Sequence, residues 1–214
     1  MHRVTICLCA MLLLCPLAPK AWAEPALTQA QIDRYNALFT EGANAVGPYL
    51  VLRGRESAPL NAAEVHRGIA LLDEAIEIHP GSWQAWLIKG KALEALNDRR
   101  ASFEAIQQAY AIDPHQQMVV NELTIGAMEL GEFTFALDAV QRGLAEFPDD
   151  LALTERLALV LLMLGRLDES IAMADRALQL APNNSISLAI RQVAIDVASG
   201  RRPQPRSMSE LHNY

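Results

Sequence analysis

Residues 164–184 read LGRLDESIAMADRALQLAPNN, a helical pattern that lies between two turn signals. Gly165 suits a tight turn between two helices because glycine tolerates positive φ angles. Pro182 cannot continue a helix, so it marks the end of the helix before it. The residues that lead up to Pro182 place apolar side chains at helical spacing. This stretch therefore predicts a helix that begins after a glycine turn and ends at a proline.

The same pattern recurs along the chain with a fixed period. Prolines stand at Pro80, Pro114, Pro148 and Pro182, each 34 residues after the one before. An apolar run precedes each of them, and Gly131 stands 34 residues before Gly165. Self-similarity at such a period is typical of proteins built from stacked repeats, in which one helix pair cannot bury its own apolar faces.

This spacing resembles the tetratricopeptide repeat family. The units that carry the resemblance are 83–116, 117–150 and 151–184, with a half repeat at 61–82. Small residues such as Gly90 and Ala136 stand at the family's positions for close helix packing. The sequence departs from the family at Lys89, where an apolar residue is usual, and at Asn97, which replaces the turn glycine. The resemblance implies an all-α fold: a right-handed superhelix of antiparallel helix pairs, with about 3.5 repeats and a C-terminal capping helix.

The repeat array is expected at 61–184, and both ends of the chain depart from it. Residues 24–60 predict an N-terminal helix and a long loop, and the helix at 29–46 reads as a displaced first helix. Residues 185–199 predict a solvated capping helix, because polar residues stand where a further unit would place apolar or small ones. Residues 200–214 carry two prolines and three arginines and are expected to form a flexible tail.

Residues 1–23 have the three zones of a secretory signal. A short basic start is followed by an apolar stretch and by a small-x-small cleavage sequence that ends at Ala23. The pattern predicts cleavage between Ala23 and Glu24 and export, to the periplasm or as a secreted protein. The alternatives are an uncut membrane anchor and a lipid on Cys15. All three cysteines lie in this segment, so the processed chain would have neither a disulfide nor a thiolate metal site.

The charge of the chain narrows the class of partner. Residues 1–23 hold two of the 18 basic residues and none of the 25 acidic ones, so the processed chain has a formal net charge of −9. This balance argues against nucleic acid or an anionic membrane surface as the main partner, since both need basic patches. The chain also has no apolar run of about 18 to 20 residues, which argues against stable membrane insertion.

Sequence patterns of catalysis and cofactor binding are absent. The chain has no HExxH, G-x-S-x-G or G-x-G-x-x-G motif, and its histidines are not at metal-ligand spacing. We therefore expect no enzyme activity, no cofactor and no metal. Carboxylates gathered in a cleft could still serve an exported enzyme or an enzyme's accessory domain, so this alternative stays open.

In the family, the first helix of each unit lines the concave surface through a few fixed positions. Carried onto this chain, the resemblance implies a partner-binding groove of Gln84, Leu87, Lys91, Glu94, Met118, Asn121, Ile125, Met128, Glu155, Leu159 and Leu162. Met128 and Leu162 would serve equally well as packing between neighbouring helices. Leu87, Glu122 and Ala152 stand where some relatives carry the polar residues that grip chaperone C-termini, so a cytosolic co-chaperone role is not expected.

These observations predict an exported, non-enzymatic protein-interaction scaffold. It would hold a peptide segment of another protein in its groove, in a role such as assembly or maturation of exported proteins in the cell envelope. A structural protein that associates with itself through exposed helix faces is the remaining alternative.

Overall fold

A computed structural model describes residues 26–50 and 58–211, and these residues form helices with no β-strand among them. The predicted signal at 1–23, part of the predicted long loop and the last three residues lie outside the described residues. No helix in the described ranges combines the length and apolarity that a bilayer crossing requires.

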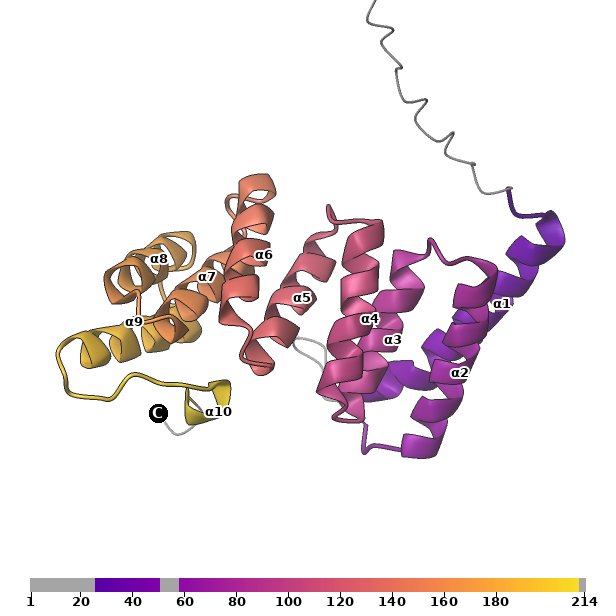
Figure 1. Ribbon diagram of the computed structural model, residues 1–214, viewed down its shortest axis with the longest axis horizontal. Coiled ribbons are helices and arrows are strands. Elements are labelled where there is room, and N and C mark those ends of the chain that lie inside the picture. Colours follow the sequence, from indigo (N-terminus) through magenta and orange to yellow (C-terminus); the bar gives the residue numbers. More distant parts are fainter. Residues whose placement is uncertain (1–25, 51–57, 212–214) are drawn as a thin grey trace, which may run out of the picture.

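Helices α1 to α9 stack side by side in chain order along an elongated array, and α10 folds back against it (Figure 1). They are α1 (Gln29–Val46), α2 (Ala62–Ile78), α3 (Trp83–Ala95), α4 (Arg99–Ile112), α5 (Gln117–Glu129), α6 (Phe133–Glu146), α7 (Leu151–Met163), α8 (Leu167–Leu180), α9 (Ser185–Ala198) and α10 (Met208–Leu211), with a 3-10 turn at Gly47–Tyr49. The first residues of α3, α5, α7 and α9 are each 34 positions apart. The predicted all-α solenoid is therefore confirmed.

The turns within the helix pairs share one backbone conformation. Gly131 and Gly165 have φ angles of 76° and 72°, and Asn97 has a φ of 61° at the equivalent position. In each turn the third residue after the helix donates its N–H back into the helix, as Glu132 does to the Ala127 carbonyl at 2.8 Å. Asn97 thus replaces the family glycine without changing the turn, because asparagine tolerates the left-handed region better than most residues.

Asn97→Ala is expected to lower the free energy of unfolding by about 1 kcal/mol, because alanine pays the full cost of the left-handed conformation. Asn97→Gly removes that cost and should be neutral or stabilising. Urea denaturation followed by circular dichroism measures both. The matched control is Asn36→Ala on an exposed part of α1, which should not be destabilising. Equal stability of the two Asn97 variants would contradict a left-handed turn at this position.

Small side chains allow the paired helices to pack closely. A Cβ added to Gly90 in α3 would lie 2.7 Å from Ile106 Cγ1 and 3.2 Å from the Ser102 carbonyl oxygen of α4. At the equivalent crossing of α7 and α8, Ser170 Oγ donates to the Ala158 carbonyl at 2.8 Å. Helix backbones this close leave no room for larger side chains.

The half repeat has a partner helix, although the two are separated by a longer connection than in the other units. The α1 and α2 helices are antiparallel, because Arg34 near the start of α1 pairs with Glu74 late in α2, at 3.5 Å. They are also close, since a Cβ added to Gly68 would lie 2.5 Å from Val46 Cγ1. The helix expected to be displaced therefore packs directly against α2.

The C-terminal segment differs from its expectation. Residues 200–214 were predicted to be a flexible tail, but residues 200–211 fold back against the array and end in α10 (Figure 1). Gln204 Nε2 donates to the Leu162 carbonyl at 2.5 Å, and Pro205 is buried. The side chain of Met208 packs against the main apolar cluster. These contacts place the segment beside α7 and α9.

Candidate peptide-binding groove

The first helices of successive units form one continuous face. The stacking is direct: Lys91 Nζ of α3 donates to Glu122 Oε2 of α5 at 2.8 Å, and Ser187 Oγ of α9 donates to Glu155 Oε1 of α7 at 2.9 Å. Each contact joins residues about one 34-residue repeat apart, so equivalent helices lie next to each other. We call the surface of α3, α5, α7 and α9 the first-helix face.

A charged cluster occupies the α3–α5 part of this face. Lys91 lies between two carboxylates, with its Nζ 2.5 Å from Glu94 Oε2 and 2.8 Å from Glu122 Oε2, and its side chain is only 11% exposed. Burial disfavours the charged form of Lys91, yet Glu122 and Glu94 together hold its pKa above the ordinary value. Lys91 is therefore a fixed cation at neutral pH.

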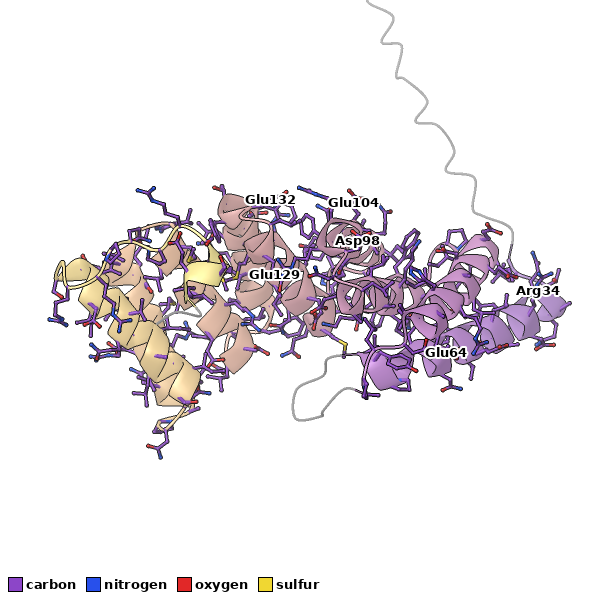
Figure 2. All side chains as sticks on the ribbon, turned by 90° about the horizontal axis from the view of Figure 1, so that it is seen from below. Arg34, Glu64, Asp98, Glu104, Glu129 and Glu132 are labelled. Atoms are coloured by element: carbon purple, nitrogen blue, oxygen red, sulfur yellow. The ribbon has the colours of Figure 1, made fainter. Side chains whose placement is uncertain are left out.

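Glu129, at the end of α5, adds a third carboxylate to this cluster. Burial raises its pKa, and the negative charge of Glu94 acts in the same direction. Arg99 Nε lies 3.7 Å from Glu129 Oε2 and works against this rise. In the view of Figure 2, Glu129 lies over the middle of the array, whereas Glu104 and Glu132 lie at its upper margin.

Lys91, Glu94, Glu122 and Glu129 are together called the acidic centre. Three carboxylates against one lysine give it a local excess of negative charge, of which Arg99 at the margin offsets a part. Such a site disfavours an incoming carboxylate and favours a cation. The net charge of the acidic centre is therefore opposite to that of a site that binds the C-terminal carboxylate of a peptide.

The other end of the first-helix face is apolar. A hollow of about 220 Å³ lies between α7 and α9 and is closed on one side by α10. Its lining consists of Leu159, Leu162, Ala189, Ile190, Val193, Met208 and Leu211. We call this feature the apolar hollow.

The structure separates the predicted groove residues into two groups. The exposed or partly exposed ones are Gln84, Lys91, Glu94, Met118, Asn121, Ile125 and Leu159. The buried ones are Leu87, Met128, Glu155 and Leu162. Among these, Glu155 is only 1% exposed because its helix position faces α9, where Ser187 is its hydrogen-bond donor. The buried residues hold neighbouring helices together, and Leu162 also lines the apolar hollow beneath α10.

Sequence reasoning did not select three residues that shape the face. Glu122 completes the acidic centre. Its spacing of 31 residues from Lys91, close to one repeat, is the sequence feature that could have indicated this contact. Met208 and Leu211 belong to the apolar hollow, and their signal was two apolar residues three apart in an otherwise polar segment. Within residues 26–50 and 58–211, no group of three or more His, Cys, Asp or Glu residues is placed to hold a metal ion.

Comparison with known proteins gives the chain its family. The tetratricopeptide repeat family model matches residues 59–116 and 125–185. None of the curated proteins compared with the chain matches it.

Solved structures agree in fold. A MamA protein is 15% identical, with a TM-score of 0.67 over 85% of this chain and 88% of its own. MamA from Desulfovibrio magneticus RS-1 is 13% identical, with a TM-score of 0.66 over 85% and 94%. YrrB, described as a TPR protein with an unusual peptide-binding site, is 17% identical, with a TM-score of 0.58 over 66% and 73%. With its family model matched over more than half its length, the chain belongs to the tetratricopeptide repeat family.

Proposed function

We propose that this protein is an exported, non-enzymatic scaffold that holds a peptide segment of a partner protein on its first-helix face. The observation that carries the proposal is the half-buried acidic centre beside partly exposed apolar residues on successive first helices. Family membership supports a protein-binding role, and the peptide-binding site described for YrrB is an example on the same fold. The signal-like segment at 1–23 supports a place in the cell envelope, in assembly or maturation of exported proteins.

The chemistry of the face indicates the kind of peptide. The acidic centre favours a Lys or Arg side chain of the partner, because the excess carboxylates attract a cation and disfavour an anion. Ile125, one turn along α5 from Asn121, offers a partly exposed apolar contact. Asn121 Oδ1 accepts no hydrogen bond from the described residues, although its Nδ2 donates to the Gln117 carbonyl at 3.2 Å. A backbone N–H of the peptide would satisfy this acceptor on rotation of the amide.

The double change Asn121→Ala with Ile125→Glu tests the proposal. It removes the amide and replaces the apolar contact of Ile125 with a carboxylate that would have to lose its water on binding, so partner binding should weaken at least about tenfold, equivalent to about 1.4 kcal/mol. The partner comes from a pull-down in the native compartment, and a binding titration gives the dissociation constants. Circular dichroism should show unchanged helical content.

The matched control is Gln141→Ala with Ala145→Glu. These two residues have the same four-residue spacing on α6, a second helix, and both are exposed. The control should bind the partner as the unaltered protein does. Weak binding by the control together with normal binding by the α5 variant would move the partner to the second-helix side and reject the proposal.

A further inference from the structure

The segment after α9 is anchored so that it must turn back toward α7. Gly200 has a φ of 73°, and the next two N–H groups, of Arg201 and Arg202, donate to the Asp196 carbonyl at 2.8 and 3.2 Å. The Asp196 carboxylate also lies 2.6 Å from Arg201 Nη2 and 3.5 Å from Arg202 Nε. This hydrogen-bonded group fixes the direction of the chain after Gly200.

Beyond this anchor, the segment contacts the first-helix face as a bound peptide would. Gln204 donates to the Leu162 carbonyl near the end of α7. The four residues of α10 then place Met208 and Leu211, three positions apart, along one side of the apolar hollow, which Leu159 and Leu162 of α7 also line. Leu159 and Leu162 are both positions at which the family resemblance implies a partner. The chain therefore occupies part of its own candidate groove.

The attachment of α10 is limited. A helix of four residues is far below the length at which a helix is stable by itself, so α10 depends on the hollow for its shape. Only two of its side chains, Met208 and Leu211, line the hollow. What favours this arrangement is the covalent link, which gives a tethered segment an effective concentration on the order of millimolar.

We propose that residues 200–211 are an internal ligand of the apolar hollow and that this hollow is a docking site for a short amphipathic helix of a partner protein. The partner segment carries two apolar side chains three positions apart, with a carboxamide four residues before the first of them, as in Gln204, Met208 and Leu211. It binds by displacing residues 200–211. This inference rests on the proposed function and adds regulation to it, because the C-terminal segment blocks the α7–α9 end of the face until a competing helix is present.

The test uses the full chain and a fluorescein-labelled synthetic peptide of residues 200–211, GRRPQPRSMSEL. In the full chain, Met208→Asp with Leu211→Asp should release the segment and open the hollow. Fluorescence anisotropy should then show the peptide binding at least about tenfold more tightly than to the unaltered chain, because the tethered competitor is gone. Ser209→Asp is the matched control: it adds a charge at an exposed position of α10 that does not line the hollow, and should leave peptide affinity at the unaltered level.

A blocking change locates the peptide. Ala189 is exposed at the rim of the hollow, so Ala189→Glu in the opened variant should reduce peptide affinity at least about tenfold without loss of helical content. A peptide with aspartate in place of its methionine and leucine should not bind. No gain in the opened variant, or an equal affinity after Ala189→Glu, overturns the inference.

A second measurement needs no change in the protein. Arg206 is exposed within the segment, so trypsin cuts after it when the segment leaves the hollow. Excess unlabelled peptide with citrulline in place of its arginines, which trypsin does not cut, should accelerate this cleavage several-fold, and the aspartate form of the same peptide should not. An unchanged rate at saturating peptide would show that residues 200–211 are a permanent part of the fold. Both measurements use only the chain's own segment, so their failure is distinct from failure of the Asn121 and Ile125 test.

Discussion

Phe103→Ala is expected to lower the free energy of unfolding by about 3–5 kcal/mol, the range for removing a large buried aromatic ring. Phe103 is 1% exposed in α4 and is the largest fully buried side chain in the described ranges. Its ring packs against Gly126 of α5, where an added Cβ would lie only 3.0 Å from Phe103 Cδ2. It also meets the ring of Phe135 in α6 edge-on, with centroids 5.7 Å apart. The alanine variant would therefore leave a cavity among three helices.

Phe135→Ala is the matched control for this change. Phe135 is 39% exposed, so its removal should cost well under half as much and leave little cavity. Urea denaturation monitored by circular dichroism gives both values, and equal losses would contradict the packing. Because each unit of a repeat protein is stabilised mainly by its neighbours, loss of Phe103 should also weaken the junction between units 83–116 and 117–150.

Much of the fold follows from the sequence because the same helix–turn–helix unit recurs every 34 residues. Each unit needs a turn, a small residue at the helix crossing and a helix end, so proline and glycine positions alone set the register. Asn97 departs from the family glycine but keeps the turn, since its φ of 61° is in the same left-handed region as those of Gly131 and Gly165. Local chemistry and the global fold agree in this part of the chain, which is why pattern analysis succeeds there.

The pairing of α1 with α2 could not be derived in the same way. The connection between them does not keep the 34-residue period, so the register of α1 is not given by counting. What places it is the contact of Gly68 with Val46 and Gly42, where added Cβ atoms would meet neighbours at 2.5 to 3.0 Å. A glycine in the middle of a helical pattern is weak information in sequence, because its reason is the neighbouring helix.

The candidate site was predicted in outline but not residue by residue. Family positions predict a face with Lys91 and Ile125 on it, but they treat every unit alike. Glu155 is equivalent to the partly exposed Asn121, yet it is buried because α9 provides Ser187 as its donor. The C-terminal segment was misjudged for a related reason. Its prolines and arginines are typical of a free tail, and only the fold shows that Asp196 directs it back.

Ala136→Leu is expected to destabilise the protein by about 1 to 3 kcal/mol, the usual cost of overpacking a well-filled core. Ala136 is fully buried in α6 and belongs to the main apolar cluster. The repeat places it opposite Thr124 of α5, as Ser102 lies opposite Gly90 and Ser170 opposite Ala158 in the neighbouring units. A leucine at this crossing must separate the two helices or leave its preferred rotamer, and both cost free energy.

The control for this change is Ala145→Leu, the same substitution at an exposed position of the same helix. Both variants make the same change in helix propensity and differ only in what surrounds the new side chain, so their difference isolates the helix crossing. The control should stay within about 0.5 kcal/mol of the unaltered protein. Thermal and urea unfolding measure the two variants in parallel. Equal stability of the two variants would mean that α5 and α6 do not meet at Ala136. The 34-residue register would then be wrong, and the same register positions Lys91, Asn121 and Glu155 on the first-helix face. This one pair of substitutions therefore tests the stacking on which the proposed groove depends.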